Sequence, residues 1–147
     1  MVTYHARTTL ALTAAGLMAA IATVPARAEM VAYKADLTAA SEVPPATSKA
    51  TGSVTATYDT ASKKLSWKGS YAGLSGDATG AHFHGPADAG KNAGVAVAIT
   101  PAKSPLEGSA TLTDAQAADL AAGKWYVNVH TAANPDGEIR GQVLKGK

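Results

Sequence analysis

The sequence predicts an all-β protein, namely a single Greek-key β-sandwich or flattened barrel of about eight antiparallel strands with one short helix. Two observations support this prediction. Much of the chain consists of short runs in which apolar and polar residues alternate. Gly, Pro, Asp, Asn and Ser separate these runs, and they favour turns. The chain contains no cysteine, so its stability must come from a hydrophobic core rather than from disulfides.

Each expected strand is an alternating run with turn-forming residues on either side. We expect strands at residues 31–37, 52–58, 64–71, 78–84, 94–100, 106–112, 125–131 and 138–144. Residues 113–122 depart from this pattern. Thr113 and Gln116 have the spacing of a capping box, and the alanines that follow favour a helix. Gly123 suits the left-handed backbone conformation that often ends a helix, so we expect a short helix before the seventh strand.

The N-terminal residues 1–28 have the features of a secretory signal peptide. Arg7 precedes an apolar run over residues 10–24, and Ala26-Arg27-Ala28 fits a cleavage site. The run is shorter and less apolar than the roughly 20 residues that a membrane span requires. We therefore expect no membrane span and an exported protein, periplasmic or extracellular, whose mature chain at residues 29–147 is one domain.

The charge of the mature chain excludes two kinds of partner. The thirteen basic residues include Arg7 and Arg27, so cleavage leaves eleven basic residues against eleven acidic residues. Nucleic acids and anionic membranes favour proteins with clustered positive charge. We expect neither as a partner.

Three histidines remain after cleavage, and their positions suggest a metal site. His82 and His84 are two residues apart on one expected strand, so their side chains point to the same face of the sheet. His130 lies on the matching polar face of another strand. If these strands are neighbours, three imidazoles converge, a ligand set that copper or zinc accepts with one position open. Copper is the first expectation and zinc the alternative.

Polar residues on the two last strands are expected to support these ligands. The turn at residues 134–137 joins the strands, and pairing their polar faces places His130 opposite Arg140, with Glu138 nearby. An arginine beside a histidine lowers its proton affinity and keeps a nitrogen free for metal. The residues expected around the ligands are Arg140, Glu138, Asn128 and Tyr126. Glu42, ahead of two prolines, is expected to brace a loop.

Several stretches resemble the CHRD domain, a module first noted in chordin and widespread in exported bacterial proteins. The resemblance covers nearly the whole of residues 29–147 and implies no defined biochemical role. The matching stretches are residues 40–45, 65–67, 71–76, 81–87, 123–131 and 134–142.

The His-x-His pair and the distant histidine also resemble the copper-binding strands of copper-zinc superoxide dismutase, an eight-stranded Greek-key sandwich whose ligands project outward. This chain lacks that enzyme's further histidine and its disulfide. The ligand geometry alone is also similar to that of the alpha-type carbonic anhydrases, which bind zinc.

These features lead to one main hypothesis and two alternatives. The first is an exported protein that holds copper, or zinc, through His82, His84 and His130 in metal handling or a simple redox step. The alternatives are a structural or adhesive module without metal and a zinc-dependent hydratase or hydrolase, for which the sequence offers no clear general base. Whether the protein is an enzyme, and whether it forms a homodimer with metal between chains, stays open.

Overall fold

The structure is a computed structural model and describes residues 27–146. The expected signal peptide, residues 1–28, lies outside the described residues except for its last two. In the described part of the chain no helix is long and apolar enough to cross a membrane. The predicted all-β fold is confirmed, because the described part of the chain consists of eight strands with one short helix and one 3-10 turn.

Within residues 27–146 the structure has eight strands, one 3-10 turn and one α-helix. In chain order they are β1 (Met30–Thr38), η1 (Ala39–Ser41), β2 (Thr51–Asp59), β3 (Lys64–Ala72), β4 (Ala78–His84), β5 (Val95–Ala98), β6 (Leu106–Thr111), α1 (Asp114–Ala121), β7 (Trp125–Thr131) and β8 (Ile139–Lys145). The expected strands agree with these bounds to within one or two residues.

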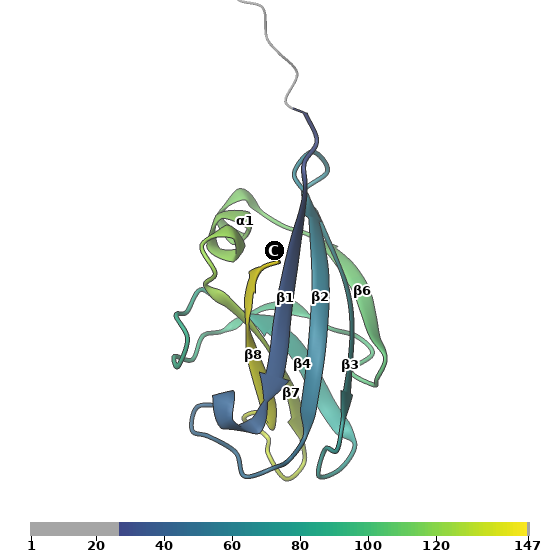
Figure 1. Ribbon diagram of the computed structural model, residues 1–147, viewed down its shortest axis with the longest axis vertical. Helices are drawn as coiled ribbons and strands as arrows, with labels where there is room; N and C mark the ends of the chain where they lie inside the picture. The colour runs from purple at the N-terminus through teal and green to yellow at the C-terminus, as the bar shows by residue number, and fades with distance from the viewer. Residues whose placement is uncertain (1–26, 147) are drawn as a thin grey trace, which may run out of the picture.

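The strands form one antiparallel sheet in the order β5-β4-β7-β8-β1-β2-β3-β6. This sheet curves into a flattened, nearly closed barrel, with β1, β2, β3 and β6 on one side and β4, β7 and β8 behind them (Figure 1). The chain crosses from β3 to β4 between the two sides, as in a Greek key. Strands β4 and β7, which carry the three histidines, are neighbours in the sheet.

The inward residues of both sides form one hydrophobic core. Phe83 of β4 packs edge-on against Trp67 of β3, with ring centroids 5.2 Å apart, and lies 5.9 Å from the ring of Trp125. Val127 and Val129 alternate with polar residues along β7 and are fully buried. The apolar residues of β4 and β7 therefore point inward, and their histidines point to the outer face.

Helix α1 begins as the sequence predicts. The Thr113 hydroxyl accepts a hydrogen bond from the backbone N–H of Gln116 at 3.2 Å, and the side-chain oxygen Oε1 of Gln116 accepts one from the Thr113 backbone N–H at 2.9 Å. Gly123 follows the helix with a φ of 71°. This capping box and glycine stop set the point at which β7 starts.

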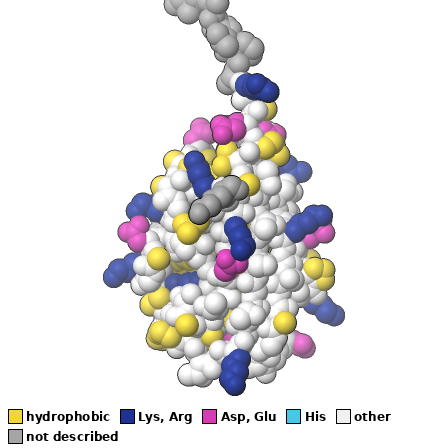
Figure 2. Space-filling model, in the orientation of Figure 1, with side chains coloured by type: hydrophobic (Ala, Val, Ile, Leu, Met, Phe, Trp, Pro, Cys, Tyr) yellow, Lys and Arg dark blue, Asp and Glu magenta, His cyan; other side chains and the backbone are white. Residues whose placement is uncertain are grey.

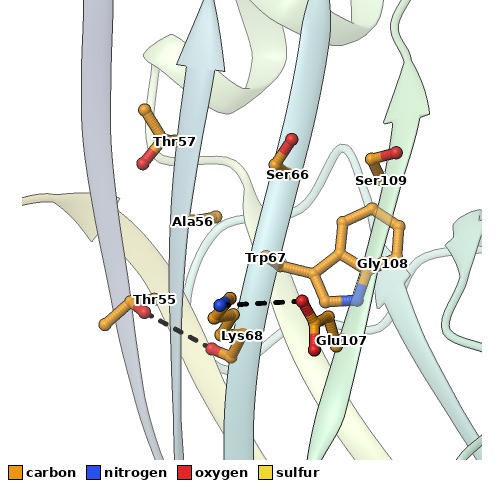
Figure 3. A pocket seen from close by; sticks show the side chains of 9 residues that line it. All are labelled: Thr55, Ala56, Thr57, Ser66, Trp67, Lys68, Glu107, Gly108 and Ser109. Atoms are coloured by element: carbon orange, nitrogen blue, oxygen red, sulfur yellow. Dashed lines mark hydrogen bonds and ion pairs between the residues drawn. The ribbon is translucent and has the colours of Figure 1, made fainter.

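The outer face of β2, β3 and β6 is open to solvent. A shallow hollow of about 460 Å³ lies there, and Figure 3 shows the side chains around it. Lys68 and Glu107 form an exposed ion pair across it at 3.6 Å. Acidic and basic side chains are interspersed on the face seen in Figure 2, as expected for a nearly neutral mature chain.

Candidate functional site

The three histidines come together on the outer face of β4 and β7. His82 and His84 project from β4, and His130 projects from β7 beside them. One possible ligand atom from each ring lies within 4.8 Å of the other two. The convergence that strand alternation predicted is therefore present in the structure.

Backbone carbonyls fix the orientation of two of the rings. His84 Nδ1 donates a hydrogen bond to the carbonyl oxygen of Ala93 at 3.0 Å, and His130 Nδ1 donates to that of Pro135 at 2.9 Å. A neutral imidazole carries one N–H, so both rings keep an Nε2 lone pair. His82 Nδ1 lies 3.1 Å from His130 Nε2 and donates to it when both rings are neutral.

The His84 ring is held by an aromatic stack. Tyr126 is its cross-strand neighbour, and the two rings are parallel to within 1° with centroids 4.9 Å apart. The guanidinium group of Arg140 lies over the Tyr126 ring, with its central carbon 4.0 Å from the ring centroid. The Tyr126 hydroxyl contacts Ala93 as well, accepting from its N–H at 3.1 Å and lying 3.3 Å from its carbonyl oxygen. His84 is thus constrained on its face and at Nδ1.

Arg140 ties two loops to this stack. Its Nε donates to Glu42 Oε2 at 2.9 Å in a buried ion pair. Its Nη1 and Nη2 donate to the Lys91 carbonyl and the Asn92 side-chain oxygen, at 3.1 and 2.7 Å. Lys91 and Asn92 belong to the segment at residues 85–94, which carries Ala93. We call this segment the covering loop.

The predicted pairing of β7 and β8 is wrong by two residues. Arg140 lies opposite Asn128 instead of His130, and Gln142 lies opposite Tyr126. Both registers keep the apolar residues inside, so alternation alone cannot distinguish them. The consequence is that Arg140 reaches Tyr126, next to His84, and its positive charge acts on His84.

Glu138 lies on the site side of the molecule but belongs to another network. Strand β8 starts at Ile139, one residue later than predicted, so Glu138 lies before the alternation begins. Its carboxylate accepts hydrogen bonds from Ser75 N–H and hydroxyl at 2.8 and 2.6 Å, Thr131 hydroxyl at 2.7 Å and Asn134 Nδ2 at 3.2 Å. Glu138 therefore ties the β7–β8 turn to Ser75, while Glu42 holds Arg140.

The outer face of β7 and β8 is buried, although its polar residues suggest solvent exposure. Tyr126, Asn128, Arg140 and His84 are all at most 8% exposed. The covering loop and the residues after η1 enclose this face through the contacts of Arg140, and Gln142 Nε2 also donates to the Ala87 carbonyl at 3.0 Å. His82 and His130 remain partly exposed.

Three buried polar atoms in this region make no hydrogen bond among the described residues: His84 Nε2, Asn128 Oδ1 and Glu42 Oε1. A buried polar atom without a partner costs about 1–3 kcal/mol. Three such atoms in one small region make it the candidate functional site.

Burial favours the neutral form of His82 and His84. It lowers the pKa of His82, and the neighbouring His130 and His84 lower it further. Burial also lowers the pKa of His84, although the Ala93 carbonyl opposes that shift. Burial raises the pKa of Glu42, against the opposite effect of Arg140. Metal ions bind the neutral form of imidazole, so these shifts favour coordination.

Sequence reasoning expected Glu42 to brace a loop but missed its partner, and it missed the covering loop altogether. Glu42 pairs with Arg140, which is 98 residues away. The only signal was its place in the stretch at residues 40–45, which resembles the CHRD domain. The covering loop offered a Gly-rich sequence without a recognisable motif.

The fold and the site together define a class of protein. It is a small all-β domain with a buried polar cluster on its outer face. A family model, the CHRD domain, matches residues 33–143. The chain therefore belongs to the CHRD domain family. No match was found among curated proteins or among solved structures.

Proposed function

We propose that this protein is exported and binds one copper ion through His82, His84 and His130, in metal handling or a simple redox step. The observation that carries the proposal is the pair of backbone carbonyls that fix His84 and His130. Each ring uses Nδ1 for a carbonyl and leaves Nε2 facing the cluster. Such contacts orient metal-binding histidines in many proteins.

Distances within the cluster are close to those of a ligand set. Two imidazole nitrogens on one tetrahedral ion, each at about 2.0–2.1 Å, are separated by about 3.3 Å. His82 Nδ1 and His130 Nε2 are 3.1 Å apart, and the widest of the three separations is within 4.8 Å. Binding then needs a small inward movement of the rings and the other neutral tautomer of His82, with its proton on Nε2 and the lone pair on Nδ1. The unpartnered Nε2 of His84 gains its partner in the ion.

The ligand type favours copper or zinc over harder ions. Three imidazoles with no thiolate and no carboxylate in the set suit copper and zinc, whereas calcium and magnesium prefer oxygen ligands. Export to an oxidising compartment and the resemblance to the dismutase copper strands favour copper. Zinc is the alternative occupant.

Isothermal titration of the exported protein with Cu²⁺ and with Zn²⁺ tests this proposal. We expect one saturable site per chain and its loss in His84→Ala. Lys68→Ala, on the opposite and exposed face, is the matched control and keeps the site. Unsaturable binding by the unmodified protein, or unchanged binding by His84→Ala, would contradict the proposal.

A structural role for the histidines predicts a different result. His82, His84 and His130 each make a hydrogen bond, so they could stabilise the fold without metal. In that case a chelator leaves the thermal midpoint unchanged. A metal site predicts stabilisation by added ion, about 2.7 kcal/mol at a concentration one hundred times the dissociation constant.

A further inference from the structure

Asn128 lies among the three histidines in the strand register. It is directly opposite His82 in the pairing of β4 with β7. On β7 it stands between His130 and Tyr126, and Tyr126 lies opposite His84. Directly opposite residues have Cβ atoms about 4.5–5.5 Å apart, so the Asn128 side chain starts beside the cluster. It is 1% exposed, which encloses its amide with the rings.

The amide nitrogen of Asn128 points to the turn between β7 and β8. Nδ2 donates to the Asp136 carbonyl at 3.5 Å. Nδ2 and Glu42 Oε1 are also among the atoms nearest to the position of a Cβ on Gly137. Carbonyl and carboxylate oxygens accept hydrogen bonds, so they favour the N–H end of the amide on this side. The carbonyl end, Oδ1, is left for the histidine side.

Oδ1 of Asn128 faces His84. Burial lowers the pKa of His84, and contact with the Asn128 side chain opposes that shift. A hydrogen-bond acceptor stabilises a proton on the ring, whereas an amide N–H does not, so the contact is made by Oδ1. Nδ1 of His84 is already bonded to the Ala93 carbonyl, which leaves Nε2 as the nitrogen next to Oδ1.

Two acceptors therefore face each other at His84. The Ala93 carbonyl only accepts, so the proton of the neutral His84 ring is on Nδ1 and Nε2 carries a lone pair. Oδ1 of Asn128 also offers only lone pairs. Both atoms are buried, and neither has a hydrogen-bond partner among the described residues. A positive species between them, a metal ion or a proton, would satisfy both.

Other oxygen donors around the cluster are engaged elsewhere. The Tyr126 hydroxyl bonds to the covering loop, and the Glu138 carboxylate accepts hydrogen bonds from its own network. Glu42 pairs with Arg140 through Oε2, and its Oε1 lies beside Gly137. Of these oxygens and Oδ1 of Asn128, only Oδ1 faces a nitrogen of the histidine cluster.

We propose, on the basis of the metal site proposed above, that Asn128 Oδ1 is the fourth ligand of the ion held by the three histidines. An amide oxygen is a weak neutral donor that copper accepts beside stronger ligands. It completes a four-coordinate ion with three nitrogens and one oxygen. A filled site of this kind suits holding or passing on the metal, whereas hydration and hydrolysis need an open position.

Electron–nuclear double resonance of the copper-loaded protein tests this inference without changing the chain. The chain has three asparagines, Asn92, Asn128 and Asn134, and all are labelled with ¹³C at the side-chain carbonyl. We expect one strongly coupled carbon, because the carbonyl carbon of a ligating amide is two bonds from the copper. The signal should disappear in Asn128→Asp, which carries no label at this position.

The copper affinities of two variants provide a second measurement. Asn128→Asp and Asn128→Leu both remove the N–H that contacts Asp136, but only aspartate keeps an oxygen donor. Asn128→Asp should bind copper at least as tightly as the unmodified protein. Asn128→Leu should bind it at least about tenfold more weakly, the loss that even an outer partner of a ligand causes. Equal affinities in the two variants would overturn the inference.

These measurements separate the fourth ligand from the metal site. Copper bound by three imidazoles, with no strongly coupled asparagine carbon, would overturn the role of Asn128 and leave the three-histidine site in place. Failure of the unmodified protein to bind copper would instead overturn the metal site and this inference together.

Discussion

The two sides of the barrel have the same alternation of inward and outward residues, but they differ in how far the outward residues are exposed to solvent. On the side of β2, β3 and β6, outward residues such as Thr55, Lys68 and Glu107 are exposed (Figure 3). On the side of β7 and β8, outward Tyr126 and Arg140 are buried under loops. Alternation sets which way a residue points in both cases, and the loops decide whether it meets water.

This difference distinguishes the candidate site from the rest of the outer surface. Outward polar residues in water need no special explanation, but a buried polar cluster loses hydration that hydrogen bonds must replace. The covered side still leaves His84 Nε2, Asn128 Oδ1 and Glu42 Oε1 without partners. A site that binds an ion gives a reason to retain such a cluster.

The largest expected difference between the two sides concerns their ion pairs. Glu42→Ala should destabilise the protein by about 3–5 kcal/mol, because it leaves Arg140 buried without its counter-charge. Glu107→Ala should cost less than about 1 kcal/mol, because its pair with Lys68 is exposed. Urea denaturation measures both changes. Similar losses in the two variants would break the comparison.

Acid should destabilise the covered side through Glu138. Burial alone would raise the pKa of this carboxyl, but hydrogen bonds from Ser75, Ser48 and Thr131 outweigh it and lower the pKa to about 2 from 4.5. Because the folded pKa is the lower one, the stabilisation is complete above pH 4.5 and is lost as the pH falls towards about 2. Denaturation midpoints at pH 7, 4 and 3 should show this decline.

Two variants sharpen this test. Glu138→Gln should flatten the decline, since the titrating group is gone. Asp59 also has a pKa lowered by hydrogen bonds, chiefly from Ser62, but it is the last residue of β2, next to the exposed turn at residues 60–63. Asp59→Asn should leave most of the acid dependence in place. A decline that persists unchanged in Glu138→Gln would exclude this carboxyl as its source.

Two tyrosines give the smallest and most specific contrast. The Tyr126 hydroxyl bonds to Ala93, and the Tyr71 hydroxyl donates to the Ala102 carbonyl at 2.8 Å and accepts from the Ser104 N–H at 3.1 Å. Replacing either by phenylalanine should cost about 1–2 kcal/mol of stability. Only Tyr126→Phe should also weaken copper binding, by about tenfold, because Ala93 orients His84. Equal copper affinity in both variants would argue against that orienting role.

The sequence predicted what depends on local patterns. Strand alternation placed the three histidines on one face, and the spacing of Thr113 and Gln116 located the helix. The sequence pattern could not distinguish between two registers of β7 and β8, because both registers bury the same apolar residues. The pairing of Glu42 with Arg140 and the burial of the outward row depend on loop contacts between distant segments, which no local pattern encodes.

The electron paramagnetic resonance spectrum of the protein with one equivalent of Cu²⁺ tests the central claim most directly. We predict a single copper species with hyperfine splitting from three imidazole nitrogens, and the loss of that species in His82→Ala, His84→Ala and His130→Ala. A spectrum of free or heterogeneous copper in the unmodified protein, or the same spectrum in all three variants, would contradict it.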